Sequence, residues 1–153
     1  MNLTAIMITS MRNRSVPADI ILPHLCYRDI DTACGWLSRA FGFREVFRYG
    51  EPLSGIQMRM GKAFIMLYGA KEWSRSPEQL GSGTQMLTIF VDDVDEHYKR
   101  SVDAGAKIIE ELHETVYGER QYGAEDLDGH RWLFSQHVRD VSPAEWGAII
   151  AKS

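Results

Sequence analysis

The chain has 153 residues, of which 44% are hydrophobic and 25% are charged, and its formal net charge is −4 at pH 7. This composition is typical of one globular domain with an ordinary core. The 17 basic side chains are scattered among 21 acidic ones, so we expect no nucleic-acid partner, which would need a concentrated positive face. The sequence has no apolar run long enough to span a membrane. We therefore expect no membrane partner and a cytoplasmic location.

Residues 1–18 are expected to form a disordered N-terminal leader, or Met11 is the true first residue. The apolar stretch Leu3–Ile8 is too short for the core of a signal peptide, and no basic residue precedes it. Cys26 and Cys34 form no CxxC motif. They are predicted to be reduced, buried thiols rather than a disulfide or a zinc site.

The first half of the chain predicts a strand, a helix and three further strands. The apolar run Ile20–Tyr27 contains Pro23, which suits an edge or early strand. Asp29 or Asp31 can cap a helix by accepting the free amide hydrogens of its first turn. Gly42 ends this helix, because glycine tolerates the positive φ found just past a helix end. The strands that follow are predicted over Phe43–Tyr49, Ile56–Met60 and Ala63–Tyr68.

The second half repeats this plan after a polar linker over residues 69–83. Gln85–Val91 predicts a strand, and the acidic residues after it cap a helix that extends to about Asp103. Arg28–Asp31 matches Asp92–Asp95, and Ala40 matches Ala104 at the same offset. The remaining strands are predicted over Lys107–Leu112, Arg120–Ala124 and Arg131–Gln136.

Each half therefore predicts a βαβββ module. One module cannot bury both faces of its small sheet, so we expect an α+β fold in which two modules form a curved mixed sheet. Its helices would cover the convex face, and a cavity would occupy the concave face. The modules are expected at about 19–70 and 84–137, within a domain of 19–138 that is followed by a C-terminal extension over 139–153.

Three segments in a fixed order carry a family resemblance. Phe41-Gly42-Phe43 follows the first cap and helix, and Val91–Asp95 precedes Ala104-Gly105-Ala106 in the second half. Tyr117–Phe134 contains the turn Asp126-Leu127-Asp128-Gly129. Together these segments resemble the vicinal-oxygen-chelate (VOC) superfamily of glyoxalases, bleomycin-resistance proteins and extradiol dioxygenases. The last segment looks like the closing hairpin of its PhnB-like, bleomycin-resistance-like branch. The resemblance, which spans about Asp19–Trp146, implies a homodimer with cavities near the subunit interface.

The resemblance also implies four metal-ligand positions, which in metal-using members carry His, Gln or Glu. Counted from the matching caps and turns, these positions fall on Leu22, Met66, Met86 and Leu133. All four are apolar, so we expect no metal and no cofactor, with a divalent metal as the alternative if the strand register differs by one residue. His24 shares the parity of Leu22 and would approach the same cavity.

The candidate ligand site is an aromatic and thioether wall, suited to a flat or apolar molecule. Half of an ordinary core is the alternative interpretation. Arg120 could clamp an anionic or carbonyl oxygen of the ligand, or could pair with Glu119, Glu125 or Asp126. Alternation on the last strand places Leu133 toward the cavity and Trp132 in the core. The candidate ligand-binding residues are His24, Phe64, Met66, Met86, Thr88, Phe90, Arg120, Tyr122 and Leu133.

The remaining histidines show no ligand spacing such as HxxxH. His97 is expected on a helix surface, His113 at a strand end, His130 in a turn and His137 beyond the last strand, all in structural or solvated roles.

These features favour metal-independent binding of a small hydrophobic or aromatic molecule by a homodimer. A metal-dependent enzyme, either a glyoxalase-type lyase or isomerase or a dioxygenase, is one alternative. A non-catalytic sensor or interaction module is the other. The sequence contains no nucleophile elbow, Ser-His-Asp pattern or phosphate loop, and we assign no catalytic residue.

Overall fold

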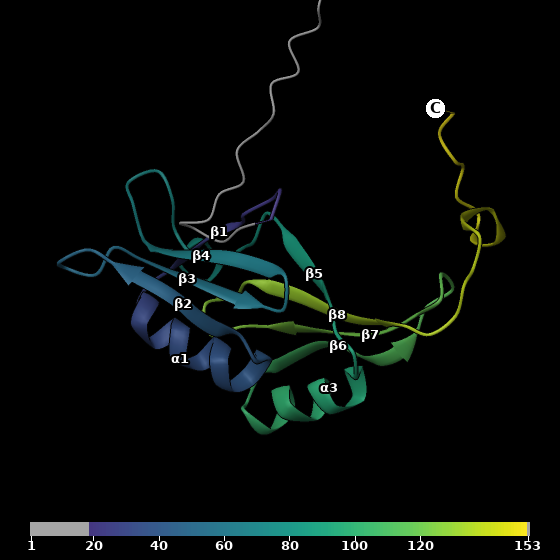
Figure 1. Cartoon of the computed structure of the whole chain (residues 1–153). Helices are drawn as coiled ribbons and strands as arrows, with labels where there is room; N and C mark the ends of the chain where they lie inside the picture. The colour runs from purple at the N-terminus through teal and green to yellow at the C-terminus, as the bar shows by residue number, and fades with distance from the viewer. Residues whose placement is uncertain (1–18, 153) are drawn as a thin grey trace, which may run out of the picture.

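The computed structural model describes residues 19–152 and contains two four-stranded sheets (Figure 1). The first sheet has the order β1-β4-β3-β2 and the second has the order β5-β8-β7-β6. β1 runs parallel to β4 in the first sheet, and β5 runs parallel to β8 in the second. The other neighbouring strands in each sheet are antiparallel. The predicted α+β fold of two βαβββ modules is therefore confirmed.

The elements of the first module are β1 (His24–Tyr27), α1 (Ile30–Phe41), β2 (Arg44–Tyr49), β3 (Gly55–Met60) and β4 (Ala63–Gly69). The short helix α2 (Pro77–Leu80) follows. The elements of the second module are β5 (Met86–Phe90), α3 (Val94–Asp103), β6 (Lys107–Glu114), β7 (Glu119–Glu125) and β8 (Arg131–His137). A 3-10 helix, η1 (Pro143–Trp146), lies in the C-terminal extension.

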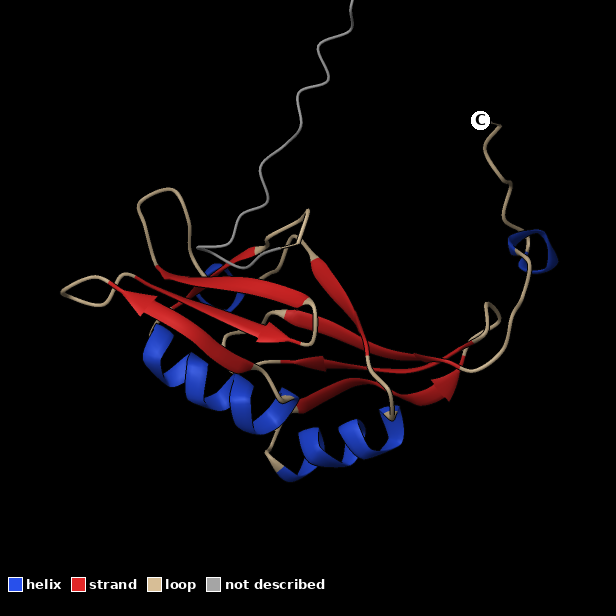
Figure 2. Ribbon diagram, viewed as in Figure 1, coloured by secondary structure: helices blue, strands red, loops and turns tan. Residues whose placement is uncertain are grey.

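Both long helices cover the same side of the two sheets (Figure 2), and α1 packs against α3. The core lies between these helices and the strands. Trp132 is buried, as its strand alternation predicted, and its ring packs against Phe41 and Phe43 from the first module. Cys26 and Cys34 are free and buried, also as predicted. Among the described residues no helix has the length and apolar character needed to cross a membrane.

The helix ends follow the predicted capping signals. Asp29 caps α1 by accepting the amide hydrogens of Asp31 and Thr32, which resolves the choice between two aspartates. Asp93 caps α3 in the same way. Gly42 ends α1 with a φ of 85°, a conformation that side chains with a Cβ rarely adopt.

Two features differ most from the sequence predictions. β1 starts at His24 rather than Ile20, because Pro23 has no amide hydrogen to donate to a strand ladder. The predicted linker contains the one-turn helix α2, whose capping box pairs Ser76 with Gln79 and places Pro77 at the first helical position. This pattern was readable in the sequence. The predicted N-terminal leader lies outside the described residues.

The β7–β8 turn joins the two modules through the buried carboxylate of Asp126. Tyr27 Oη, from the first module, donates to Asp126 Oδ2 at 2.6 Å, and Trp132 Nε1 donates to the same oxygen at 3.1 Å. Asp126 Oδ1 accepts the amide hydrogens of Asp128 and His130, both at 3.0 Å. Burial raises the pKa of Asp126, since the interior disfavours its charged form. Oδ1 is thus satisfied within its own turn, whereas Oδ2 gains its second donor, Tyr27, only when the modules meet.

Two neighbouring residues, Asp128 and His130, strengthen the same joint. Asp128 accepts the backbone amide of Arg28 at 2.6 Å and its Nε at 3.0 Å. His130 Nε2 donates to the backbone carbonyl of Cys26 at 2.6 Å. The imidazole of His130 also packs on the ring of Tyr27, with the centroids 4.7 Å apart.

A second polar cluster joins α3 to α1 and β7, and it corrects the prediction for His97. This side chain is half-buried rather than on the helix surface, and its ring lies 4.2 Å from that of Phe134. His97 Nε2 donates to the carbonyl of Phe41 at 2.8 Å, so Nδ1 accepts from Tyr122 Oη at 2.5 Å. Ser101 Oγ lies 2.5 Å from the same hydroxyl. Burial lowers the pKa of His97.

The joint between the modules predicts unequal effects for two tyrosine substitutions. Tyr27→Phe removes a buried donor from Asp126 and should cost about 1–3 kcal/mol of unfolding free energy. Tyr98→Phe removes a hydroxyl that bonds Glu111 at 2.6 Å on the surface, and its cost should be much smaller. Urea denaturation of both variants measures the difference. Equal losses would contradict the role given to Asp126.

The half-buried imidazole of His97 predicts a pH dependence of stability. Unfolded histidine has a pKa of about 6.5, and burial lowers the pKa of His97 in the folded chain. As pH falls below about 6.5 the unfolded state therefore binds the proton first, and stability decreases. Between pH 7.5 and pH 5.5, the urea midpoint should fall further for the wild type than for His97→Gln. An equal fall in the two proteins would show that His97 does not titrate as described.

Candidate functional site

The second sheet exposes apolar side chains on the face away from the helices. Met86 and Phe90 are 55% and 66% exposed, and Thr88 between them is also exposed. The parallel register pairs Thr88 with Leu133 on β8. Gly123 on β7 lies beside Leu133, and a Cβ there would come within 3.1 Å of the leucine side chain. Glycine at this position therefore leaves room for Leu133 on the face.

The first sheet presents a corresponding face that is more enclosed. His24 on β1 pairs with Met66 on β4, and Cys26 pairs with Tyr68. His24 is exposed, whereas Met66 is only 8% exposed. Phe64 and Tyr68 are half-buried. These side chains alternate with core residues such as Leu25, which point toward α1.

Seven of the predicted ligand-binding residues thus lie on sheet faces away from the helices, although on two separate sheets. The other two, Arg120 and Tyr122, lie on the opposite side of β7. Arg120 contacts Asp95 on α3 with two hydrogen bonds, at 2.9 and 3.1 Å. Tyr122 is fully buried beneath α3, where it bonds His97. The structure therefore does not bring these two side chains to the predicted wall, and the ion-pair partner of Arg120 is Asp95.

A polar cluster that sequence reasoning missed lies at the other end of the second face. Gln121 Oε1 accepts from Ser135 Oγ at 3.2 Å and from Tyr117 Oη at 2.9 Å. Its Nε2 donates to Glu110 at 3.2 Å, and Glu110 also contacts His113 Nε2 at 2.6 Å. Strict alternation would place residues 110 and 113 on opposite faces. A register shift between Glu110 and His113 in β6 brings them to the same face, and only the pairing with β7 reveals this shift.

The donor set at the four implied metal positions does not fit a divalent cation. Leu22 precedes β1, and Met66, Met86 and Leu133 lie on the two sheet faces. Leucine offers no donor, and thioethers are poor ligands for hard or borderline divalent ions. Within residues 19–152, no three His, Cys, Asp or Glu side chains are grouped so that they could hold a metal ion.

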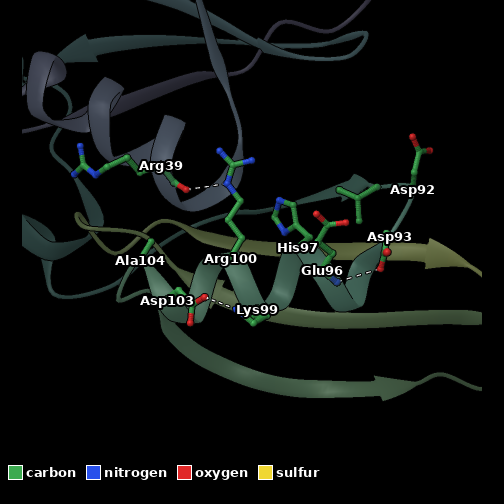
Figure 3. A pocket seen from close by; sticks show the side chains of 10 residues that line it. Arg39, Asp92, Asp93, Glu96, His97, Lys99, Arg100, Asp103 and Ala104 are labelled. Carbon is green, nitrogen blue, oxygen red and sulfur yellow. Dashed lines mark hydrogen bonds and ion pairs between the residues drawn. The ribbon is translucent and has the colours of Figure 1, made fainter.

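A groove of about 740 Å³ lies on the helix side, between the end of α1 and α3 (Figure 3). Three of its charged side chains, Lys99, Arg100 and Asp103, already have partners within the chain. Arg100 Nε donates to the backbone carbonyl of Arg39 at 2.9 Å, and its Nη2 to that of Ser38 at 2.8 Å, which satisfies the carbonyls at the C-terminus of α1. Lys99 pairs with Asp103. We therefore assign the candidate site to the sheet faces rather than to this groove.

Comparisons with known proteins agree with this architecture. An uncharacterized protein of Mycobacterium bovis is 28% identical over 139 residues, which cover 84% of this chain and 90% of the relative. TioX from Micromonospora sp. ML1 has a solved structure that matches with a TM-score of 0.65 and 33% identity, covering 77% of this chain and 98% of TioX. A glyoxalase/bleomycin resistance protein/dioxygenase family enzyme from Burkholderia phytofirmans PsJN shares the fold, with a TM-score of 0.63. It is 22% identical, and the match covers 79% of this chain and all of that enzyme.

The family assignment rests on a sequence model as well as on shape. The model described as the Glyoxalase/Bleomycin resistance protein/Dioxygenase superfamily matches residues 19–134, which contain both modules up to the middle of β8. With its two βαβββ modules and its matched segment, the chain belongs to the glyoxalase/bleomycin resistance protein/dioxygenase superfamily.

Proposed function

We propose that this protein binds a small hydrophobic or aromatic molecule without a metal, and that it does so as a homodimer. The observation that carries the proposal is the apolar row on the second sheet, which consists of exposed Met86 and Phe90 and half-buried Leu133. Large apolar side chains in a row on a sheet face are typical of a surface that another molecule covers. We also propose that the chain belongs to the PhnB-like branch and acts in the cytoplasm.

A homodimer would turn two half-walls into a cavity. In one chain, Phe64 and Met66 lie on the first sheet, whereas Met86 and Phe90 lie on the second. Two copies could pair so that the first-sheet face of one chain lies opposite the second-sheet face of the other. Aromatic and thioether groups would then line both walls. Such a lining suits flat, apolar ligands, because thioethers are polarizable and adapt to the ligand shape.

The polar cluster would orient a ligand that the apolar row holds. Gln121 and Glu110 lie on the same face of the second sheet as Leu133, towards its far end. Burial of a ligand against Phe90 and Leu133 would supply affinity, and these polar groups would select molecules with a matching hydrogen-bonding group. We assign no catalytic step to them.

The metal-dependent alternative makes an opposite prediction for metal content. Because Leu22, Met66, Met86 and Leu133 offer no suitable donors, the purified tag-free protein should retain well under one ion per chain after incubation with Zn²⁺, Ni²⁺, Mn²⁺ or Fe²⁺. Elemental mass spectrometry measures the ratio. One ion per chain would contradict the proposal, and isomerase and ring-cleavage activity would then be the first properties to assay.

The binding face predicts a strong effect for a charge placed in the apolar row. Phe90→Glu should weaken binding of N-phenyl-1-naphthylamine, a neutral aromatic fluorophore, by about tenfold or more, since a carboxylate in an apolar cavity is costly. It should also shift the dimer toward monomer in analytical ultracentrifugation.

The matched control is Val102→Glu on α3, where the native side chain is 44% exposed on the helix side. This variant should keep both fluorophore binding and the dimer. Equal effects of the two variants would contradict the assignment of the face. A wild type that neither dimerises nor binds the fluorophore would favour the sensor or interaction module instead.

A further inference from the structure

We propose that the first-module face recognises a planar aromatic carboxylate, with the ring against Trp73 and Tyr68 and the carboxylate beside Arg75. This inference rests on the proposed function and names the ligand class. Neither Trp73 nor Arg75 belongs to the set of binding residues predicted from the sequence. The argument combines an anchored exposed indole, a row of rings and a small pocket whose described lining includes Arg75 but no carboxylate.

Trp73 is exposed and yet held in place. Its side chain is 79% exposed, but the loop that carries it is closed by a bridge between Lys71 and Ser74, with backbone hydrogen bonds of 2.9 and 3.2 Å. Ser74 Oγ lies 2.6 Å from Tyr68 Oη, which attaches this loop to β4. An aromatic side chain on an anchored loop loses little conformational freedom when a ligand stacks on it. The loop therefore presents the indole in a pre-organised position.

The indole extends a row of rings that begins on the sheet face. Trp73 stacks on Tyr68 with the ring centroids 6.0 Å apart and the planes at 24°. Tyr68 in turn lies 6.5 Å from the imidazole of His24. Because Tyr68 and Met66 share one face of β4, this row continues the proposed apolar wall to the edge of the first sheet. A row of aromatic rings suits a planar aromatic ligand, which can stack on them.

A small pocket of about 100 Å³ opens beside these rings. Its described lining includes Arg75 but no Asp or Glu. The pocket is lined by Tyr68, Ser74, His24 and Gln85 among others. Since one water takes about 30 Å³, the pocket has room for a substituent of a few atoms rather than for a ring system.

The charge at this pocket selects an anionic substituent. Arg75 donates to the carbonyl of Ser74 through Nη1 at 3.1 Å, which leaves its other donors for a ligand. Its planar guanidinium matches the geometry of a carboxylate.

The small size of the aromatic row favours a small molecule over a protein partner at this place. A stable interface between two proteins buries about 800 Å² on each side, far more than three neighbouring rings provide. The ring and carboxylate subsites are also adjacent, because Tyr68 and Arg75 line the same small pocket. One bicyclic acid can therefore occupy both.

The test compares three naphthalene-sized probes by isothermal titration calorimetry on the full chain. 2-Naphthoate should bind. Decahydro-2-naphthoate keeps the carboxylate but lacks a flat ring, and 2-naphthylmethylammonium keeps the ring but reverses the charge, so each should bind at least tenfold more weakly. Equal affinity for all three probes, or no binding of 2-naphthoate, would overturn the inference.

Two pairs of variants locate the subsites. Trp73→Leu should weaken 2-naphthoate about tenfold, whereas Trp146→Leu, at a 42% exposed tryptophan in η1, should not. Arg75→Gln should weaken 2-naphthoate and leave neutral 2-methoxynaphthalene unchanged. Lys62→Gln, which removes the same charge from the exposed β3–β4 turn, should alter neither. Wild-type affinity for 2-naphthoate in Trp73→Leu or Arg75→Gln would overturn the inference.

Binding of N-phenyl-1-naphthylamine separates this inference from the proposed function. Its affinity depends on the apolar row that contains Phe90, and it carries no carboxylate for Arg75. Retained fluorophore binding with no preference for 2-naphthoate would remove only the aromatic carboxylate site. Loss of both in the wild type would remove the proposed function as well. Trp73→Leu should keep the wild-type melting temperature, because its side chain is exposed, so lost affinity in this variant would not reflect unfolding.

Discussion

The arrangement of the two modules depends on the buried carboxylate of Asp126. A carboxylate taken out of water is stable only where several donors replace the lost hydration, and two of its donors, Tyr27 and Trp132, come from different modules. The tyrosine hydroxyl and the indole can reach one oxygen only if β1 and β8 lie close together on the helix side. This requirement joins the sheets and places α1 against α3, as Figure 1 shows.

Because the modules meet through their helix sides, their other faces remain available for binding. The large aromatic groups of the core, including Phe41, Trp132 and Phe134, pack between the helices and the sheets. On the strands, the residues that alternate with these core side chains point away from the helices. On β5 this leaves Met86 and Phe90 exposed. The same alternation that builds the core therefore creates the apolar face that carries the proposed function.

The fold and the chemistry of this family are separable, and this chain illustrates why. A βαβββ module needs apolar residues on the helix side and turn residues between strands, but the opposite face imposes no such demand. Here Leu22 precedes β1, and the sheet faces carry Met66, Met86 and Leu133 at the other three implied ligand positions. The polar groups gather at the far end of the second face, around Gln121. An apolar, polarizable lining favours ligand burial over metal chemistry.

The sequence by itself determined the fold and much of its local detail. Local rules suffice for the caps at Asp29 and Asp93, for the stop at Gly42 and for the alternation that buries Trp132, because each involves only neighbours along the chain. Seven of the nine candidate binding residues follow the same alternation and lie on the expected faces.

Tertiary structure alone decided the contacts that join distant segments. The register shift between Glu110 and His113 in β6 brings these two side chains together, and no alternation pattern predicts it. Arg120 pairs with Asp95, and His97 lies against Tyr122, because α3 crosses β7 at those positions. The position of Trp73 depends on the hydrogen bond that joins Ser74 to Tyr68. Hydrogen bonds and ring contacts between segments depend on where the chain returns in space, which local sequence does not specify.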